Sequence, residues 1–165
     1  MPVTEIATLR LVSPRTWDSS DVQSFFKAFS EAQIEWMGSP SGYFKDASDP
    51  SIVYVVKSWD SVVAHHEWIA STLNQELLKK AKGLLEVEGL VHAELECKVE
   101  KSSMVLWTRW HVAPGEITAT LEDSGRAVEE EGTVWSLKGY ARAEDIDGNT
   151  EGKKAILMKK VSLSS

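Results

Sequence analysis

The chain has 165 residues, of which 42% are hydrophobic and 26% are charged, and its net charge is −7. A chain of this length buries roughly 70% of its unfolded surface, so it can fold as one domain, or one domain with an extension, without a disulfide or a metal. The negative charge argues against nucleic acid and against an anionic membrane as partner, because both attract clusters of Lys and Arg.

Strands and helices alternate along the first hundred residues. Apolar residues recur at every second position in the expected strands and at helical spacing in the expected helices. The expected elements, in chain order, are a strand over 3–12, a helix over 19–36, strands over 42–46 and 52–57, a helix from 60 to about 82 and a strand over 89–99. The small polar pair Ser71-Thr72 either kinks the second helix or starts another one. This order predicts an α+β fold built on a ferredoxin-like split-βαβ unit.

A polar stretch at 100–103 separates a second segment from the first. The second segment contains an expected strand over 104–112, a weakly helical stretch over 116–130, and strands over 133–143 and 153–163 joined by a polar turn at 147–149. We interpret residues 1–100 as the ferredoxin-like unit and residues 101–165 as a β-rich segment that completes or extends its barrel. The β-α-β-β order suggests a degenerate second repeat that lacks the last helix and strand.

The sequence carries no pattern typical of export or of a membrane anchor. Cys97 is the single cysteine, so no internal disulfide can form, and we expect it to be a small buried residue on a strand. Residues 1–12 lack the basic and apolar regions of a signal peptide, and no apolar run approaches the ~20 residues of a membrane helix. We therefore expect a soluble, cytoplasmic protein.

Residues 54–71 carry a pattern that resembles a known family. The pattern reads Tyr54-x4-Trp59-x-Ser61-Val62-x-Ala64-His65-x3-Ile69-x-Ser71. It resembles the central segment of the dimeric α/β-barrel superfamily, and most of all the fungal version of its antibiotic-biosynthesis-monooxygenase-type branch, over residues 3–98. The resemblance implies that the sheet packs against a second unit, in a homodimer or in an intramolecular pseudo-dimer. It also implies a ligand cavity between the sheet and the helices.

The chemistry of that superfamily is varied. Its members include cofactor-free monooxygenases of aromatic polyketides, polyketide cyclases, haem-degrading enzymes, isomerases and proteins without known activity. A Tyr–His pair that is catalytic in similar plant cyclases is replaced by Trp68 and Asn74 here. The haem-degrading branch combines an Asn, a Trp and a helix His; Trp59 and His65 match the last two, but no Asn partner is found. Haem binding through His65 is therefore the least favoured alternative.

Two adjacent histidines, His65 and His66, are the candidate catalytic residues. At ~100° per residue, His66 falls in the middle of the apolar stripe of its expected helix and His65 at the edge of that stripe. His65 occupies the position that the family pattern fills with His. A neutral imidazole beside an apolar cavity is suited to proton transfer near neutral pH. The alternative is that one ring is a core residue and the other is solvated. Adjacent helix positions diverge, so no shared metal site is expected.

Two further histidines lie on strands. His92 shares an expected strand face with Glu94, and the pair either lines the cavity as an acid and a base or belongs to a polar seam. His111 follows Trp107 and Arg109 on one strand face, where the row either binds an anionic oxygen or forms a cation–π ladder. We favour the seam and the ladder.

The aromatic residues provide candidates for the walls of a ligand pocket. Core packing is the default for each of them, but seven Trp in so small a chain favour an aromatic-lined cavity. The candidate substrate-binding residues are Trp36, Tyr43, Tyr54, Trp59, Trp68, His92 and Trp110. The phosphate-binding patterns GxGxxG and GxxxxGK[ST] are absent, so we expect no nucleotide cofactor, and we expect no metal or other cofactor.

These observations favour a cofactor-independent tailoring enzyme. We expect it to cyclise or isomerise a hydrophobic, polyketide- or terpenoid-like metabolite of secondary metabolism, with a histidine moving a proton. A cofactor-free monooxygenase of an aromatic polyketide is the closest alternative, and a non-catalytic protein that binds small molecules is another.

Overall fold

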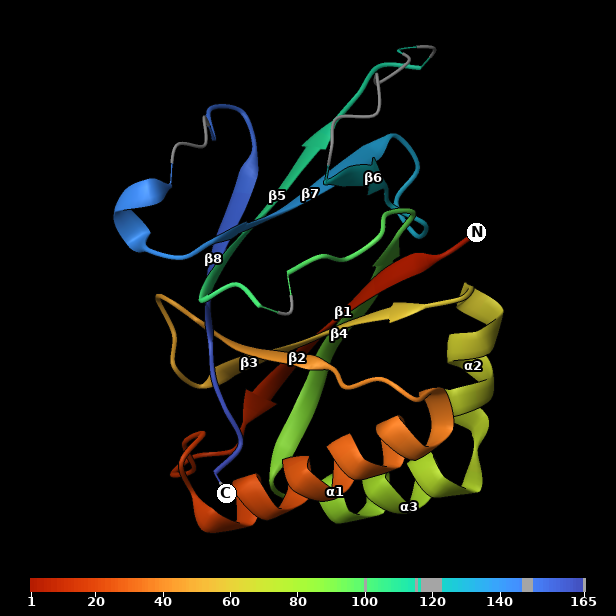
Figure 1. Ribbon diagram of the computed structural model, residues 1–165, viewed down its shortest axis with the longest axis vertical. Coiled ribbons are helices and arrows are strands. Elements are labelled where there is room, and N and C mark those ends of the chain that lie inside the picture. Colours follow the sequence, from red (N-terminus) through yellow and green to blue (C-terminus); the bar gives the residue numbers. More distant parts are fainter. Residues whose placement is uncertain (100, 115, 117–122, 147–149, 165) are drawn as a thin grey trace.

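The computed structural model describes residues 1–99, 101–114, 116, 123–146 and 150–164. They form an antiparallel eight-stranded sheet with helices packed on one face of its first half (Figure 1). The elements are β1 (Val3–Leu11), α1 (Ser20–Met37), β2 (Gly42–Asp46), β3 (Ile52–Trp59), α2 (Val62–Ala70), α3 (Thr72–Ala81), β4 (Leu85–Ala93), β5 (Met104–His111), β6 (Ser124–Arg126), β7 (Thr133–Tyr140), a 3-10 helix (Ala143–Asp145) and β8 (Lys154–Lys160). The predicted α+β, ferredoxin-like fold is confirmed.

The first half has the strand order β4-β1-β3-β2, with every neighbouring pair antiparallel. Its helices end and begin where the sequence has suitable caps. Gly38 ends α1 in the left-handed region (φ 74°), where its N–H donates to the carbonyl of Ile34. The Ser61 hydroxyl accepts from the amide of Ala64 at the start of α2, and Ser71 caps α3 in the same way. The predicted break at Ser71 is thus a start of a separate helix.

The second half repeats the strand order of the first. Its order is β8-β5-β7-β6. If β5 to β8 are counted as a second set of four strands, this order is again fourth, first, third, second. The expected strand over 153–163 is β8, but the prediction that the repeat is one strand short is wrong, because β6 supplies a fourth strand that was not expected. The predicted helix over 116–130 is also wrong over 123–130, where β6 and a turn stand instead. The rest of that stretch, apart from residue 116, and the predicted turn at 147–149 lie outside the described residues.

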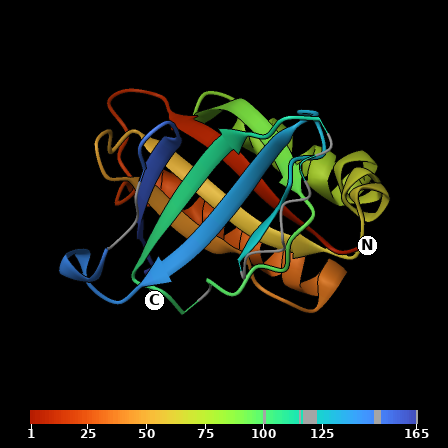
Figure 2. The same ribbon diagram turned by 90° about the horizontal axis from the view of Figure 1, so that it is seen from above.

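The two halves join in two places. In the middle of the strand order β2 pairs with β8, with Phe44 opposite Lys160. Between the two end strands, an isolated bridge links Ala93, at the end of β4, to Ala127 after β6, and the amide of Val128 donates to the carbonyl of His92 at 2.9 Å. The sheet therefore curves round within one chain (Figure 2).

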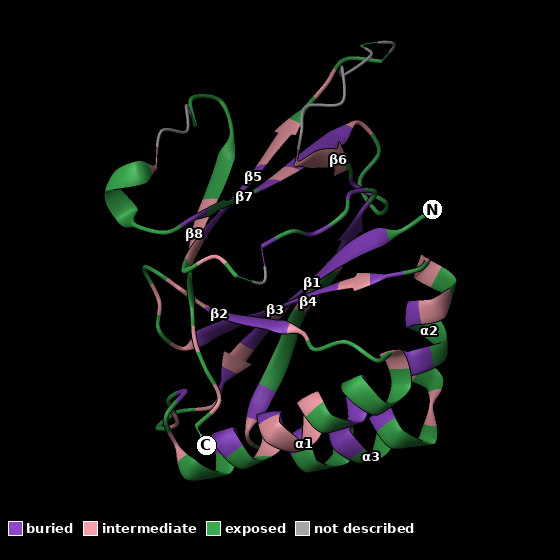
Figure 3. Ribbon diagram, in the orientation of Figure 1, coloured by how far each residue is buried: buried purple, intermediate pink, exposed green. Residues whose placement is uncertain are grey.

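The two faces of the sheet bury separate cores. The concave face between the halves is filled by side chains from both, among them Ile6, Phe44, Tyr54, Trp107, Trp135 and Met158. The other face of the first half packs against α1, α2 and α3 through residues such as Ala7, Leu9, Phe26 and Val55. The helices stay exposed on their outer sides (Figure 3). The space between sheet and helices is thus where a ligand cavity is expected.

Gly125 is required for the closure between β4 and β6. A Cβ atom placed on Gly125 would lie 2.1 Å from the carbonyl oxygen of Glu94, which is backbone and cannot move aside cheaply. We expect Gly125→Ala to lower the free energy of unfolding by about 1–3 kcal/mol, as overpacking does. Chemical denaturation measures this loss. Gly89→Ala is the control, since a Cβ there meets nothing closer than 3.8 Å; an equal loss in both variants would contradict the steric explanation.

Candidate active site

A cavity of about 220 Å³ lies between the helix face of the sheet and the helices. Its wall is mainly apolar, with Phe25, Phe29, Trp68, Ile69, Leu78 and Leu90 among the lining residues, and its polar lining residues are Glu5, Gln33, His65 and Asn74. Leu78, Val87 and Leu90 are partly exposed, which places the mouth between α3 and β4. A larger hollow of about 710 Å³ is lined by residues of 111–114, 116, 126–128 and 131–134, and these described residues include no buried acid or base. We therefore place the candidate site in the smaller cavity.

Strand register brings ionisable residues into one row under the helices. Glu5 on β1 stands opposite Lys57 on β3 and opposite His92 on β4. Residues directly opposite in an antiparallel pair point to the same face of the sheet. All three side chains are buried, with relative exposures of 5%, 3% and 2%. Lys57 turns away, since its Nζ donates to the carbonyl of Ser39 at 2.6 Å.

Four side chains form a continuous series of polar contacts from the cavity to the surface. His65 Nε2 lies 3.2 Å from Glu5 Oε2, which also accepts from Trp59 Nε1 at 2.5 Å. His65 Nδ1 lies 2.7 Å from His92 Nε2. His92 Nδ1 in turn lies 2.5 Å from Glu129 Oε1. Glu5 and His65 line the cavity, whereas the Glu129 side chain is 37% exposed at the other end.

Burial keeps both cavity-lining groups neutral. Burial raises the pKa of Glu5 to about 8, although the Trp59 hydrogen bond and the charge of Lys57 oppose this rise. Burial lowers the pKa of His65 to about 3, with further lowering by His92 and His66. At neutral pH, Glu5 is therefore a carboxylic acid and His65 an uncharged imidazole.

One placement of the protons gives every contact between Glu5, His65, His92 and Glu129 a donor and an acceptor, with both imidazole rings neutral. The Glu5 hydroxyl donates to His65 Nε2, and the same oxygen accepts from Trp59. His65 Nδ1–H donates to His92 Nε2, and His92 Nδ1–H donates to the Glu129 carboxylate. This assignment follows from the donors and acceptors in contact. Each group therefore has a proton donor on one side and an acceptor on the other.

The structure separates the two candidate catalytic histidines. His65 is buried in the site, whereas His66 is exposed, so the expectation that His66 faces the cavity is wrong. The expected apolar stripe treated residues 62–77 as one helix. Because the helix ends at Ala70 and Ser71 caps it, α2 is a short separate helix, and its buried residues are His65 and Trp68.

His92 is at the site, but with a different partner from the one expected. Glu94 is exposed and follows the end of β4, so the expected His92–Glu94 pair is wrong. The carboxylate beside His92 comes from Glu129, far away in the sequence. Neither a ligand-lining pair nor a polar seam describes His92, which is buried behind His65.

Two of the six candidate aromatic residues belong to the site. Trp68 lines the cavity. Trp59 lies behind it, where its ring stacks on His65 at 4.5 Å between centroids and its N–H holds Glu5. Trp36 is 45% exposed and packs on Trp68 at 5.8 Å between ring centroids. Tyr43 is buried in the core with Phe26.

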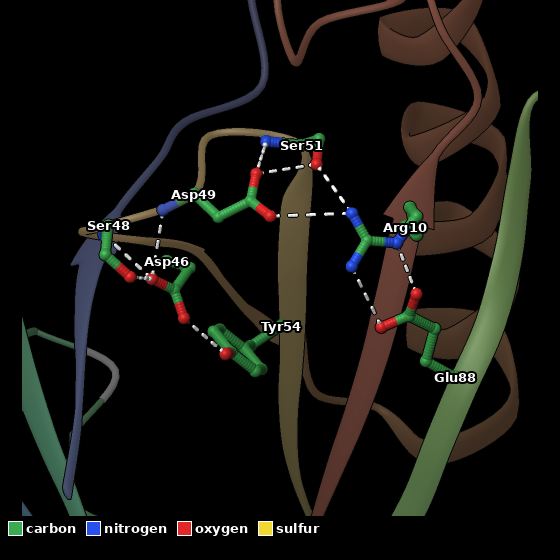
Figure 4. A network of polar contacts seen from close by, with 7 residues as sticks. All are labelled: Arg10, Asp46, Ser48, Asp49, Ser51, Tyr54 and Glu88. Carbon is green, nitrogen blue, oxygen red and sulfur yellow. Dashed lines mark hydrogen bonds and ion pairs between the residues drawn. The ribbon is translucent and has the colours of Figure 1, made fainter.

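The other two aromatic candidates lie away from the cavity. Tyr54 points to the concave face, packs against Trp107, and donates from its hydroxyl to Asp46 Oδ2 at 2.6 Å (Figure 4). Trp110 lies on β5, where the Lys153 ammonium is 4.4 Å from its ring. None of Trp36, Tyr43, Tyr54 and Trp110 is in the cavity wall, so the predictions that they line the pocket are wrong. The same holds for Trp59 and His92, which stand behind the wall and contact Glu5 or His65 instead.

Polar groups elsewhere have structural explanations. Figure 4 shows Arg10 on β1 between Glu88 on β4 and the turn before β3, where it contacts Asp49 and Ser51. On β5, the Arg109 guanidinium lies 4.5 Å from the Trp107 ring, as the cation–π alternative predicts. Cys97 is buried, as expected, but it lies beyond the end of β4 and not on a strand, so that part of the prediction is wrong.

Sequence reasoning missed the two acids of the site. Glu5 had a detectable signal, because it is the single charged residue on the otherwise apolar face formed by Val3, Ala7, Leu9 and Leu11. Glu129 had none, since it begins a run of three glutamates that reads as a solvated segment. In the described part of the chain, no group of three or more His, Cys, Asp or Glu is arranged to hold a metal ion. No described helix is long and apolar enough to cross a membrane.

Comparisons with known proteins agree on the fold. No family model matches the chain, and no curated protein matches it in sequence. A candidate monooxygenase from Fusobacterium nucleatum subsp. nucleatum has a TM-score of 0.64 at 10% identity, covering 98% of this chain and 93% of its own. A candidate monooxygenase from Lactobacillus acidophilus NCFM has a TM-score of 0.62 at 12% identity, covering 96% and 93%. A candidate chlorite dismutase has a TM-score of 0.57 at 6% identity, covering 98% and 95%.

These neighbours span nearly the whole chain, including the second half. Identities this low show the fold alone, and the same fold is found under two different enzyme names. The expected membership of the fungal branch stays a prediction. The chain has a ferredoxin-like α+β fold, which it shares with these structural neighbours.

Proposed function

We propose that this protein is a cofactor-independent tailoring enzyme that moves a proton on a small apolar substrate. The observation that carries the proposal is the contact of 3.2 Å between the Glu5 carboxyl and the His65 imidazole, both buried, in the wall of one apolar cavity. A catalytic acid or base works best when its pKa is close to the operating pH, and the raised pKa of Glu5 meets that condition. Isomerisation and cyclisation are the reactions that need little more than this.

The proposed chemical step takes place at the carboxyl of Glu5. In its ionised form Glu5 accepts a proton from a C–H beside a carbonyl, or from a phenol, and in its neutral form it returns that proton to another atom of the same molecule. Trp59 fixes the carboxyl through its N–H. The apolar wall excludes water, which strengthens the interaction between the carboxyl and the developing anion. His65 stays neutral and passes or receives the proton at Nε2.

The size of the cavity narrows the substrate class. About 220 Å³ is below the ~300–1,000 Å³ of typical ligand sites. A compound of one or two rings fits this space better than a large polycyclic one. We therefore propose a small aromatic or alicyclic ketone, enol or phenol as the substrate, of polyketide or terpenoid type.

A cofactor-free monooxygenase is the second candidate, and the names of two structural neighbours favour it. It would begin with the same deprotonation, after which the substrate anion reacts with O₂. A CH₂ group of the substrate would become a carbonyl: one oxygen atom would enter the product, and the other would leave as water with the two hydrogens of that CH₂. Oxygen consumption with a product that has one more oxygen and two fewer hydrogens would identify this reaction and reject isomerisation.

Solvent exchange into a ketone tests the proposal. The probe is 2-tetralone, a bicyclic ketone with acidic C–H groups, incubated with the protein in D₂O and followed by proton NMR. We expect the wild type to accelerate deuterium uptake. Leu90→Trp fills the mouth of the cavity from β4, and it should abolish the acceleration. Val63→Trp, on an exposed site of α2, is the matched control and should keep it.

The outcomes separate an enzyme from a carrier. Exchange that persists in Leu90→Trp would show that the cavity is not the site. Absence of exchange in the wild type, together with tight binding of 2-tetralone that Leu90→Trp removes, would favour the non-catalytic alternative.

A further inference from the structure

We propose that His92 and Glu129 relay protons between the cavity and solvent, so that the second half of the chain completes the site of the first. The inference rests on the proposed proton transfer at Glu5 and His65. His92 is only 2% exposed and does not line the cavity, so it has no direct access to a substrate. It nevertheless contacts His65 on one side and Glu129 on the other. A buried imidazole between two proton-exchanging groups is arranged for transfer.

The position of Glu129 is fixed by the closure of the sheet. Glu94 N–H donates to the Arg126 carbonyl at 2.8 Å, and Val128 N–H donates to the His92 carbonyl at 2.9 Å. The Glu129 carboxylate then accepts twice from one residue, since Oε2 takes the His92 amide at 2.8 Å and Oε1 takes the ring. These contacts hold the carboxylate against the ring while its other side stays in water. The relay thus ends at a group that can exchange protons with solvent.

Three coupled proton transfers carry one proton from Glu5 to Glu129, and both imidazole rings are neutral before and after the transfer. The Glu5 hydroxyl proton moves to His65 Nε2, the His65 Nδ1 proton moves to His92 Nε2, and the His92 Nδ1 proton moves to Glu129. Glu5 becomes a carboxylate, Glu129 becomes an acid that releases its proton to water, and both rings have exchanged tautomers. The reverse passage restores the first state. A neutral ring on each side of the transfer suits His65, whose charged form is disfavoured by burial.

Other groups near this series do not provide the same path. Lys57 is opposite Glu5 but donates to Ser39, and Trp59 has a single N–H, which Glu5 occupies. His66 is exposed, and its ring centre lies 6.4 Å from that of His65, without a hydrogen bond between the two among the described contacts. The described contacts therefore lead from His65 to solvent through His92 and Glu129.

Removal and chemical replacement of the Glu129 carboxylate test the relay. We expect Glu129→Ala to slow deuterium uptake by 2-tetralone about 100-fold, at the lower end of what a proton-transferring side chain contributes. Added formate, a small carboxylate, should restore much of the rate by occupying the space left beside His92. A residue with a merely structural role would not be rescued in this way. Glu130→Ala, at the next exposed position, is the control and should behave as the wild type with and without formate.

A second measurement needs no substrate. Nitrogen-15 NMR of the imidazole rings should show His65 and His92 protonated at Nδ1 in the wild type. In Glu129→Gln, the side-chain amide can donate to His92 Nδ1, and both rings should switch to the Nε2-protonated form, because His92 Nε2–H then donates to His65 Nδ1. Exchange of 2-tetralone that is equally fast in Glu129→Ala, or rings protonated at Nε2 in the wild type, would overturn the relay. Failure of the wild type to exchange 2-tetralone, with the expected ring protonation present, would instead count against the proposed function alone.

Discussion

Glu5→Gln is expected to fold normally and to lose deuterium exchange into 2-tetralone by about 10²–10⁴-fold, the usual contribution of a general acid or base. The Gln side chain has the size and polarity of the protonated acid. Both hydrogen bonds of the neutral site meet at Glu5 Oε2, so Gln keeps one of the two: its oxygen in that position accepts from Trp59 Nε1, or its amide in that position donates to His65 Nε2. It cannot become a carboxylate, so no proton is accepted from the substrate. Exchange rates of the wild type and of Glu5→Gln measure the loss of activity, and thermal melts of both proteins show whether the variant folds normally.

The control for Glu5→Gln is His66→Gln. His66 neighbours His65 in sequence but is exposed, so this change should leave exchange within about twofold of the wild type. Binding of 2-tetralone should survive in both variants, because neither change alters the apolar wall. Wild-type rates in Glu5→Gln would end the assignment of Glu5 as the acid and base. Loss of activity in His66→Gln would show that the helix rather than the buried series is responsible.

The stability of the wild type is expected to fall between about pH 6.5 and pH 8, and Glu5→Gln is expected to remove this fall. Native Glu5 keeps its proton up to a pKa of about 8, whereas in the unfolded chain it loses the proton near 4.5. Between these values the unfolded state binds fewer protons, so stability decreases as pH rises. Each pH unit is worth about 1.4 kcal/mol. Relative to the wild type, Glu5→Gln should therefore gain about 3–4 kcal/mol between pH 5 and pH 8.

The ionisation of His65 changes the stability with pH in the opposite direction to that of Glu5, and both contribute to the pH profile of the free energy of unfolding. The native His65 pKa of about 3 lies below the unfolded value of 6.5, so the unfolded state binds more protons as pH falls below 6.5, and stability decreases. Between pH 4.5 and pH 6.5 the effects of Glu5 and His65 cancel, and stability should be nearly flat. Urea denaturation at several pH values measures the profile. Glu67→Gln, at an exposed position of α2, is the control; a constant offset between Glu5→Gln and the wild type would show that Glu5 ionises normally in the folded protein.

The second half of the chain has a clear role in this arrangement. It keeps the four-strand order of a ferredoxin-like unit, and only a 3-10 helix is found in its described connections. Its strands fill the concave face with Trp107 and Trp135, and the segment after β6 places Glu129 beside β4. The second half thus contributes packing on the concave face and one end of the proposed relay, whereas the cavity lies in the first half.

The amino-acid sequence by itself determined the local structure and the fold class. Alternating apolar residues define β1, and a continuous run of β-branched and aromatic residues defines β3. Gly38, Ser61 and Ser71 set the helix ends. These features depend on neighbours within a few residues. The tertiary structure alone decided which polar groups meet. Glu5, His65, His92 and Glu129 come from four separate segments, and their contacts depend on strand register, on the break between α2 and α3, and on closure of the sheet. Periodicity shows which side a residue faces along its own element, but a hydrogen bond requires atoms of distant segments to lie within about 3 Å.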